Sequence, residues 1–311
     1  MGKKVTVFGS FVVDLMGRTP HLPVPGETVK GSMFKMGPGG KGFNQGVAAH
    51  KAGADVTMVT KLGKDTFAEV ALQAMKELSM DSGRVFFTKE TETGAALIMV
   101  DESTSQNEIV VVLGACNTIT NEEVESLTDL IEASDYLLTQ LETNVSSVEK
   151  IVDIAYQKGA KVILNTAPVQ PISETVLSKI DLITPNEVEA EILTGICIDS
   201  KESADKAANW FFQRGVKNVL ITLGSRGVYI ATNEKSGIIP AYQVKAIDTT
   251  GAGDAFNGGL VAALSEGKDL WEAAQFANAL AAISVQRIGT TPAMPTREEI
   301  EQFLSNHSDK H

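Results

Sequence analysis

The sequence predicts a three-layer α/β fold in which helices cover both faces of a mostly parallel β-sheet. After residue 120, short apolar segments alternate with amphipathic ones, an order typical of parallel strands joined by helices. The expected strands span residues 136–141, 162–165, 182–184 and 219–222. The expected helices span residues 145–158, 173–178, 201–214, 270–286 and 298–304. We expect a single domain over residues 1–311, without repeats or long linkers.

The first third of the chain departs from this alternation. Residues 5–15 form a β-branched run that carries Asp14 at its far end, which predicts a buried strand ending on an acid. Prolines and glycines follow, and the segments of about 16–36 and 95–113 contain strand-like stretches. We expect these two segments to form a small β-sheet lid, set apart from the main body.

Composition and charge argue against several classes of protein. The 27 Lys and Arg residues against 39 Asp and Glu give a net charge of -12, and no basic run interrupts the pattern. This balance disfavours nucleic acid or a membrane as partner, and no apolar run approaches the ~20 residues that span a bilayer. Cys116 and Cys197 lack Cys-x-x-Cys spacing, so neither a disulfide framework nor zinc is indicated. We therefore expect a cytoplasmic protein.

Polar or small residues follow several apolar strands at their carboxyl ends, where ligands bind in open α/β sheets. These positions are Asp14, Glu142, Asn165, Asn186, Glu187, Glu189, Thr222 and Gly224. The carboxyl ends of parallel strands share one edge of a sheet. The sequence therefore predicts an active site along that edge.

The sequence Gly251-Ala252-Gly253-Asp254 joins a strand-like segment, residues 242–246, to an apolar helical run. The first turn of a helix carries free N–H groups and partial positive charge, and small residues there let a phosphate approach the backbone. The Asp254 carboxylate stands where that phosphate would sit. The alternative is an ordinary helix start, because glycine makes turns and Asp caps helices.

Residues 37–42, Gly-Pro-Gly-Gly-Lys-Gly, match the Gly-x-Gly-x-x-Gly spacing of dinucleotide-binding loops, which makes a nucleotide-dependent oxidoreductase the second candidate. The context argues against it, because the acid expected to close the second strand is misplaced: Asp55 opens that strand. The remaining interpretation is a loop whose backbone approaches a small ligand, with Lys41 and Asn44 presented at the start of a helix over 45–51.

Residues 184–189, Thr-Pro-Asn-Glu-Val-Glu, place an amide and two carboxylates at a strand end, where oxygen atoms suit Mg²⁺ held largely through water. A helix cap with a charged first turn explains the same residues and, taken alone, is favoured. Residues 223–227, Leu-Gly-Ser-Arg-Gly, follow a buried strand as a glycine turn that could admit a nucleotide.

Together these motifs resemble the ribokinase-like (PfkB) sugar kinases over nearly the whole chain. The resemblance rests on residues 39–45 (Gly-Gly-Lys-Gly-Phe-Asn-Gln), 140–142 (Gln-Leu-Glu), 184–187, 220–227 and 248–254. Two family signatures occur in order at the expected places. The resemblance implies a central α/β domain, a β-sheet lid that commonly doubles as a dimer interface, and transfer of the ATP γ-phosphate to a sugar's primary hydroxyl.

The resemblance also implies roles for individual residues. Asp254 corresponds to the catalytic base, and Gly251, Ala252 and Gly253 correspond to the anion hole. The sugar contacts would be Val12, Asp14, Gly40, Lys41, Asn44, Glu142 and Asp254. The ATP contacts would be Asn186, Thr222, Gly224, Ser225, Gly227, Gly253 and Asn278. Mg²⁺ and its waters would be organised by Asn186 and Glu189. K⁺ would be held, mostly by backbone carbonyls, at Asp248, Thr250, Ser284, Arg287 and Gly289.

Three positions depart from the pattern of the family. Val12 stands where ribokinases usually carry an Asn that pairs with a sugar hydroxyl, and burying a hydroxyl against Val costs ~1–3 kcal/mol. Similar kinases with an apolar residue there use 2-deoxyribose, so we expect 2-deoxy-D-ribose to be accepted at least as well as D-ribose, unless Val12 is simply core. Phe43 replaces a usually small residue and either narrows the pocket or packs outward. Ala293 replaces a Ser near the cation, which makes K⁺ dependence less secure.

The residue pattern and the resemblance together predict a cytoplasmic, ATP- and Mg²⁺-dependent kinase of ribose or 2-deoxyribose, with K⁺ as activator and a homodimer formed through the lid. A kinase of another sugar or of a nucleoside is the nearest alternative. An NAD-dependent oxidoreductase and a sugar-binding regulator without catalysis are more distant, because the fingerprint acid is misplaced and the Asp254 turn is intact.

Overall fold

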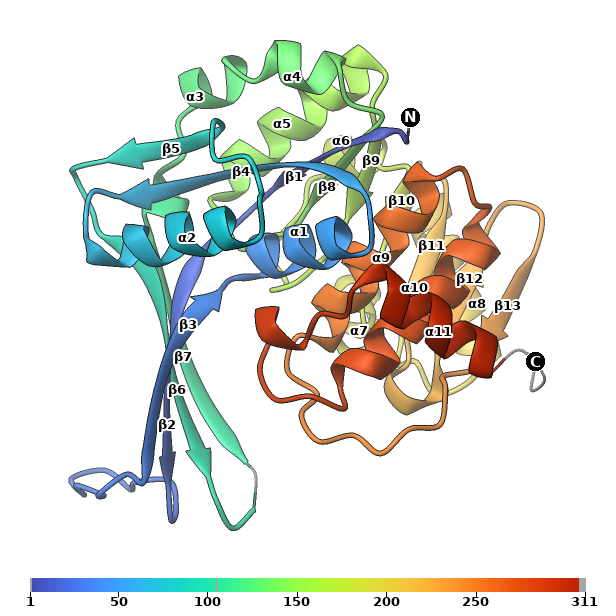
Figure 1. The fold of residues 1–311 in the computed structure, drawn as a ribbon. Coiled ribbons are helices and arrows are strands. Elements are labelled where there is room, and N and C mark those ends of the chain that lie inside the picture. The colour runs from blue at the N-terminus through green and yellow to red at the C-terminus, as the bar shows by residue number, and fades with distance from the viewer. Residues whose placement is uncertain (1, 105, 308–311) are drawn as a thin grey trace.

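Two β-sheets organise the chain, and the computed structural model describes its residues 2–104 and 106–307 (Figure 1). Within these residues the larger sheet has nine strands in the order β13-β12-β11-β10-β9-β8-β1-β4-β5. Neighbouring strands from β11 to β5 are parallel, while β12 and β13 form an antiparallel edge. The predicted mostly parallel sheet is confirmed. The strands are β1 (Lys4–Phe8), β4 (Asp55–Gly63), β5 (Val85–Thr88), β8 (Tyr136–Thr139), β9 (Lys161–Leu164), β10 (Leu182–Ile183), β11 (Val219–Thr222), β12 (Val228–Ala231) and β13 (Ser236–Ile239).

Helices cover both faces of the larger sheet and complete three layers. One face carries α1 (Lys41–Lys51), α2 (Thr66–Glu77), α9 (Ala252–Ser265), α10 (Leu270–Ser284) and α11 (Arg297–Asn306). The other carries α3 (Asn121–Glu125), α4 (Thr128–Glu132), α5 (Val145–Lys158), α6 (Glu174–Leu177), α7 (Glu187–Thr194) and α8 (Lys201–Phe212). Strand side chains alternate between the faces, so Leu138 of β8 packs in the first core and Leu137 in the second. None of the helices in the described ranges is both long and apolar enough to cross a membrane.

Helix α1 is packed backbone against backbone on two sides. A Cβ on Gly258 of α9 would lie 2.4 Å from the Cβ of Ala48 and 2.6 Å from the Gln45 carbonyl oxygen. A Cβ on Gly42 would lie 2.5 Å from the carbonyl carbon of Gly9. Contacts this short leave no room for a side chain at Gly258 or Gly42. Helix α1 is therefore held at close range to both α9 and the segment after β1.

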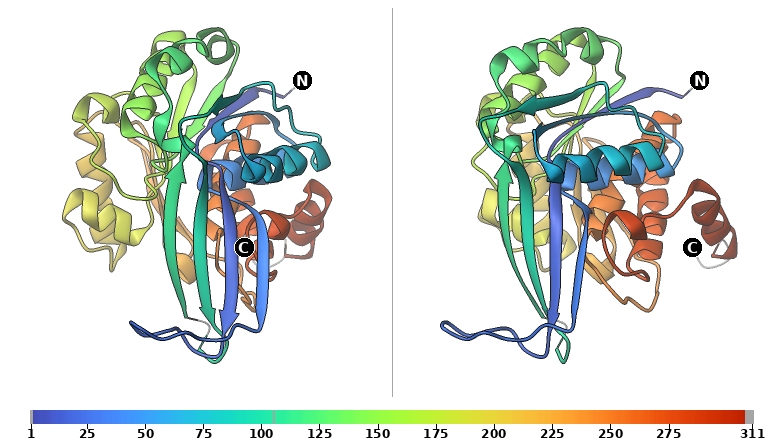
Figure 2. Two further views of the ribbon diagram at one scale, coloured as in Figure 1. Left: turned by 90° about the vertical axis from the view of Figure 1, so that its left-hand side faces the viewer. Right: turned by 60° about the vertical axis from the view of Figure 1, so that its left-hand side comes forward.

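The smaller sheet extends from the body as a long ribbon (Figure 2). Its strand order is β3-β2-β6-β7, in which β2 runs parallel to β6 and antiparallel to β3. The strands are β2 (Val12–Thr19), β3 (Met33–Gly39), β6 (Thr93–Asp101) and β7 (Asn107–Gly114). Its inner face shares a cavity with the body, and its outer face exposes apolar side chains such as Phe34 and Val110.

Two of the predicted strands are wrong. Residues 5–15 form two strands rather than one, β1 of the larger sheet and β2 of the smaller. Gly9 lies at the break, where a Cβ would come within 2.8 Å of the Gly42 Cα, so the chain changes sheet where α1 packs against it. Residues 242–246 form no strand. Their alternation instead buries Tyr242 against Phe303 of α11, with the ring centroids 5.1 Å apart.

Candidate active site

The N-terminus of α9 faces the carboxyl ends of the central strands across a cavity of about 180 Å³. Gly251, which precedes the helix, has a φ of 76°, the left-handed conformation that favours glycine. The cavity is lined by Lys41, Asn165, Ala167, Thr184, Asn186, Glu189, Thr222, Thr249, Gly251, Ala252, Gly253, Asp254 and Asn257. The structure thus places the Gly-Ala-Gly-Asp turn opposite several of the strand-end residues that the sequence singled out.

Asp254 occupies the first turn of α9 and is 7% exposed. Its Oδ2 accepts a hydrogen bond of 3.1 Å from the Asn44 amide, and its Oδ1 accepts one of 3.0 Å from the Gln45 amide. The Gln45 amide also donates to Asn165 Oδ1 at 3.0 Å, and Gln140 donates to Gln45 Oε1 at 2.7 Å. Two neutral donors therefore orient the carboxylate without neutralising it, which suits a group that accepts a proton.

The backbone at the start of α9 supplies N–H groups without internal partners. The Ala252 N–H donates to Thr249 O at 3.2 Å, but in the described chain the N–H groups of Gly251, Gly253 and Asp254 have no backbone acceptor. A Cβ on Gly253 would meet nothing within 4 Å, so the space before it is open. Free donors and open space at a helix N-terminus are the features of an anion site.

Glu142, which follows β8, binds the start of α1. Its Oε2 accepts hydrogen bonds from Ser10 Oγ at 2.6 Å and from the Lys41 backbone N–H at 2.8 Å. Burial alone would lower the pKa of the Lys41 ammonium, but the charges of Asp254, Glu142 and Glu189 outweigh this effect and raise that pKa above its ordinary value. Lys41 therefore remains protonated in the cavity that the start of α9 also lines.

Val12 faces away from the hydrophobic cores. It is 2% exposed yet belongs to neither core, whereas its neighbour Val13 is part of the first. Because strand side chains alternate, Val12 lies on the same face of β2 as Asp14. Gly40 approaches this strand so closely that a Cβ on it would lie 2.9 Å from the Val12 nitrogen. Val12 is therefore buried outside the two large apolar clusters, and its contact with a sugar stays a prediction.

Asp14 lies within β2 and not, as predicted, at the end of a strand of the larger sheet. Burial raises the pKa of its carboxyl to about 6, and the negative charges of Glu142 and Asp254 act in the same direction. Its Oδ2 accepts a long hydrogen bond of 3.5 Å from Thr290 Oγ1. A Cβ on Gly39 would lie 2.2 Å from Asp14 Oδ1, so the carboxylate rests directly on glycine backbone.

Asn186 and Glu189 form a capping box at the start of α7. Asn186 Oδ1 accepts the Glu189 N–H at 2.8 Å, and Glu189 Oε2 accepts the Asn186 N–H at 3.0 Å. Glu189 Oε2 also accepts a hydrogen bond of 2.9 Å from Thr166 Oγ1. In the part of the chain that the structure describes, no three His, Cys, Asp or Glu side chains are grouped to hold a metal ion. A cation here would depend on water and phosphate oxygens.

Of the positions expected to contact a nucleotide, Asn186, Thr222 and Gly253 line this cavity, and the others lie outside its lining. Thr222 lines it, at the end of β11. Gly224 and Ser225 lie in the 3₁₀ turn that follows, and Gly227 ends the turn with a φ of 104°. Asn278 stands on α10, where its amide donates to a backbone carbonyl at 3.4 Å. These residues come from β11, the turn that follows it and α10.

Comparison with known proteins decides the family, because the family model described as pfkB family carbohydrate kinase matches residues 2–297. The chain belongs to this family. A ribokinase of Haemophilus influenzae is 44% identical over 306 residues, which cover 98% of this chain and 100% of the relative. A deoxyribokinase of Salmonella typhi is 33% identical over 302 residues, which cover 97% and 98%. The structure of Arabidopsis thaliana ribokinase complexed with ribose and ATP has a TM-score of 0.90 at 29% identity and covers 98% of this chain and 99% of its own.

Membership of the family sets aside the dinucleotide-binding interpretation of residues 37–42. In this sugar kinase the stretch ends β3 of the smaller sheet and begins α1. Gly40 has a φ of 90°, and its Cβ would press on β2, so the glycines serve a close approach between loop and strand. The close approach seen here is between the loop and β2, and the predicted approach to a small ligand stays a prediction.

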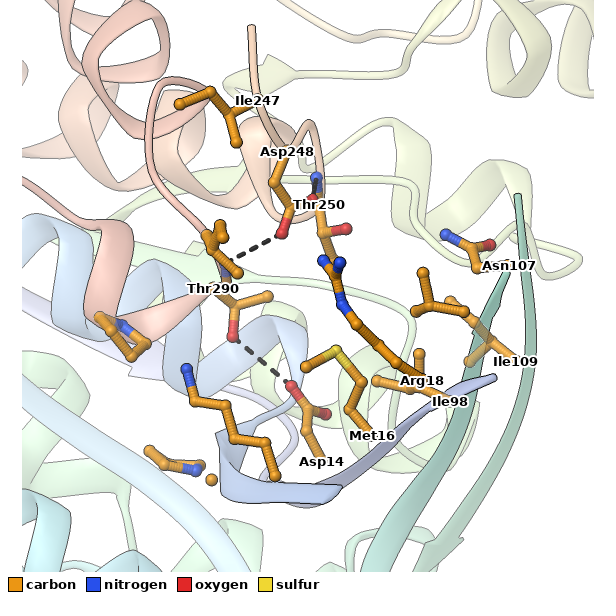
Figure 3. A pocket seen from close by; sticks show the side chains of 17 residues that line it. Asp14, Met16, Arg18, Ile98, Asn107, Ile109, Ile247, Asp248, Thr250 and Thr290 are labelled. Atoms are coloured by element: carbon orange, nitrogen blue, oxygen red, sulfur yellow. Dashed lines mark hydrogen bonds between the residues drawn. The ribbon is translucent and has the colours of Figure 1, made fainter. Parts of the chain in front are cut away.

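A second cavity of about 160 Å³ lies between the small sheet and the segment that leads to α9 (Figure 3). In this segment Asp248 Oδ1 accepts the Thr250 N–H at 2.9 Å, and Oδ2 accepts the Gly289 N–H at 2.9 Å. Burial would raise the pKa of Asp248, but these hydrogen bonds and the nearby charge of Arg18 hold it below its ordinary value. The Asp248 carboxylate therefore ties two loops of the kinase together.

Positions expected to hold K⁺ carry open carbonyl oxygens. Among the described residues, no backbone N–H donates to the carbonyls of Thr250, Arg287 or Gly289, whereas the Ser284 carbonyl accepts the Arg287 N–H at 3.0 Å. Ala293 is buried in the 3₁₀ turn Thr291–Ala293 and adds no side-chain oxygen. The donor set consists of oxygen atoms, which suits a hard monovalent cation.

Phe43 packs into the core and away from the cavity. It is fully buried, and its ring meets Phe11 edge to face with centroids 5.2 Å apart. Phe43 lines neither cavity, so it does not narrow the pocket, and it packs inward against the core rather than outward.

Three polar residues that hydrogen-bond to Glu142, Asp254 or Asn44 were not predicted as site residues: Ser10, Gln45 and Thr291. Gln45 is fully buried on α1, and a buried polar side chain inside a helix is the signal that could have revealed it. Thr291 donates to Asn44 Oδ1 at 2.9 Å from a distant turn that carries no motif of its own.

Proposed function

We propose that this kinase transfers the γ-phosphoryl group of ATP to the 5-hydroxyl of D-ribose or 2-deoxy-D-ribose. The observation that carries the proposal is the convergence of Asp254, Lys41 and free backbone N–H groups on one cavity. They supply the base, the counter-charge and the anion site that phosphoryl transfer requires. The names of the relatives, ribokinase and deoxyribokinase, support a pentose as acceptor.

Asp254 is the proposed base. Its carboxylate takes the proton of the sugar 5-hydroxyl as that oxygen attacks the γ-phosphorus in line with the leaving oxygen of ADP. Asn44 and Gln45 aim the carboxylate through their hydrogen bonds of 3.1 and 3.0 Å. Because the transition state is loose, the position of the base matters more than its strength.

The anion hole is the proposed role of the turn over residues 251–253. The N–H groups of Gly251, Gly253 and Asp254 lack backbone acceptors and can donate to the charge that develops on the transferred group. Loss of one such donor typically costs about 3 kcal/mol of transition-state stabilisation. The small side chain of Ala252 leaves the approach open, and the Lys41 ammonium adds a positive charge from the opposite wall.

ATP is proposed to lie along the edge formed by Thr222, the turn over residues 224–227 and Asn278. When bound, Mg²⁺ would neutralise the phosphates and K⁺ would support the anion-hole loop. Asn186 and Glu189 are proposed to act on Mg²⁺ through water, because both line the phosphate cavity. The proposed K⁺ site consists of Asp248, Thr250, Ser284, Arg287 and Gly289. Within the described residues, all of these except Ser284 carry carbonyls free of backbone hydrogen bonds.

The sugar is proposed to lie between the two cavities. Asp14 lines one cavity and Lys41 the other. The proposed sugar contacts are Val12, Asp14, Gly40, Lys41, Asn44 and Glu142. Val12 offers no hydrogen bond, and a buried hydroxyl without a partner costs roughly 1–3 kcal/mol. We therefore expect 2-deoxy-D-ribose to be used at least as well as D-ribose.

The smaller sheet is proposed to act as a lid and as the interface of a homodimer. Met36, Leu97 and Val110 share one transverse row of its outer face and are 49%, 50% and 57% exposed. A continuous apolar patch of this kind typically marks an interaction surface.

Cys116 and Cys197 are both unpaired, which supports the cytoplasm as location.

An assay of ADP release over ribose, 2-deoxyribose, fructose and adenosine, each with and without K⁺, tests the proposal. We expect turnover with the two pentoses and a loss of several orders of magnitude in kcat for Asp254→Asn, with sugar binding nearly intact. Turnover with fructose or adenosine alone would identify another acceptor. Sugar binding without ADP release from the wild-type protein would instead indicate a regulator, and full activity of Asp254→Asn would remove Asp254 from its role.

A further inference from the structure

Two cationic side chains of the smaller sheet converge on the loops that hold Asp248 and Gly289. Arg18 of β2 and Lys35 of β3 line the same cavity as Asp248, Thr250 and Gly289. Lys35 pairs with Met16, and Arg18 lies two residues beyond Met16, so both point to the inner face of the sheet. Figure 3 shows Arg18 extending from its strand toward Thr250 and Asp248.

Neither cation is used elsewhere in the described chain. The side chains of Arg18 and Lys35 form no hydrogen bond or ion pair there, and Arg18 Nε is buried without a partner. Arg18 acts electrostatically on Asp248. A Cβ built on Gly289 would lie 3.8 Å from Lys35 Nζ, which places that ammonium at the second loop.

We propose that Arg18, assisted by Lys35, supplies a fixed positive charge at these two loops and thereby lessens the need of this kinase for a monovalent cation. The inference rests on the proposed function of the loops as a K⁺ site. A monovalent cation there and a guanidinium beside Asp248 would act on the same carboxylate and carbonyl dipoles. Each reduces the mutual repulsion of these oxygen atoms.

Arg18 acts on the proposed anion hole through Asp248 and the short segment that follows it. Asp248 holds the Thr250 N–H, and the chain passes from Thr250 directly into Gly251, the residue before α9. Disorder in this segment would move the N–H groups of residues 251 and 253. Arg18 is therefore a positioning residue, since it acts through Asp248 and touches no reacting atom.

The position of Arg18 on the smaller sheet has a second effect. The same strand carries Val12 and Asp14, so the sheet that borders the sugar also brings the guanidinium to the Asp248 loop. Ordering of this sheet by a bound sugar would thus strengthen the anion hole.

The test compares wild-type kinase with Arg18→Met, Arg18→Lys and Lys35→Met, in K⁺ and in tetramethylammonium at equal ionic strength. Arg84→Met, a change of an exposed arginine before β5, is the matched control. Two quantities are measured: kcat and KM from ADP release, and the change in melting temperature that K⁺ produces without substrates. The second does not require turnover, so it remains informative if the acceptor sugar has been misidentified.

We expect wild type and Arg84→Met to retain most of their kcat without K⁺ and to show a small K⁺-dependent melting shift. In Arg18→Met the kcat without K⁺ should fall roughly tenfold, recover in K⁺, and be accompanied by a larger melting shift. Arg18→Lys should be intermediate, and Lys35→Met should show a weaker form of the Arg18→Met response. A wild-type enzyme as dependent on K⁺ as Arg18→Met would overturn the proposal, as would a loss in Arg18→Met that K⁺ does not restore.

Discussion

Replacing Val12 with Asn should turn the sugar preference of the kinase toward ribose. Val12 is 2% exposed, belongs to neither hydrophobic core and shares a face of β2 with Asp14. Asn is somewhat smaller than Val, so the change adds an amide to the face of β2 that carries Asp14 without overfilling the site. The fold should therefore tolerate it, and the effect should appear in recognition.

The size of the shift follows from the burial of this position. With ribose, the new amide can bond the 2-hydroxyl, which contributes about 1 kcal/mol. With 2-deoxyribose, the amide stays buried without that partner, which costs about 1 kcal/mol more. The two effects add to about 2 kcal/mol of discrimination between the sugars. The ratio of kcat/KM for ribose to kcat/KM for 2-deoxyribose should therefore rise roughly thirtyfold.

Initial rates of ADP release over a range of both sugar concentrations measure this ratio. Val12→Thr, which keeps the shape and adds a hydroxyl, should shift the ratio in the same direction by less. Val12→Ala adds no polar group and should lower both values of kcat/KM while leaving their ratio in place. An unchanged ratio in Val12→Asn, or a wild-type enzyme that already strongly prefers ribose, would refute the reasoning.

Other substitutions separate stability from function. Asp14→Asn should raise the melting temperature at pH 7 while weakening sugar binding. The pKa of Asp14 is about 6 in the folded protein and 3.8 ordinarily, so its ionisation destabilises the folded protein by up to about 3 kcal/mol above pH 6. This destabilisation vanishes below pH 4. Melting curves of both proteins from pH 4 to pH 8 measure this, and a gap that does not change with pH would contradict it. Gly253→Ala should leave the melting temperature unchanged, since the new Cβ meets nothing within 4 Å. The methyl group should nevertheless lower kcat at least about tenfold, because it enters the cavity proposed to hold the phosphate, and unaltered kinetics would rule out an anion there. Val110→Lys, at a position that is 57% exposed, should convert a dimer to a monomer in light scattering, and a wild-type monomer would remove the proposed interface.

Local signals explain why much of the fold could be predicted from the sequence. Helix α5 was predicted to its ends because its apolar positions repeat at helical spacing and Gly159, with a φ of 83°, stops it. Strand β11 was likewise predicted in full. The turn before Asp254 could be recognised because small residues, an acid and an apolar helix follow one another directly in the chain.

Other features depend on contacts between distant residues and left no local trace. Residues 5–15 are apolar in both strands that they form, so their pattern does not reveal that the chain changes sheet at Gly9. Residues 242–246 alternate between apolar and polar because Tyr242 packs on α11, and this alternation looks the same in the sequence as that of a strand. The hydrogen bond from Thr291 to Asn44 joins residues 247 positions apart, and a single threonine in the sequence does not indicate such a partner.

The glycine contacts of α1 have a consequence for how this kinase can diversify. Since Gly258 and Gly42 lock α1 against α9 and the segment after β1, the proposed base and the two amides that aim it form one rigid unit. Val12 and Arg18 belong to the strand β2 of a ribbon that leaves the body, with Val12 at its base and Arg18 further along it. Changes in that ribbon can therefore alter which sugar is admitted, and under which ionic conditions, while the reacting centre is inherited intact.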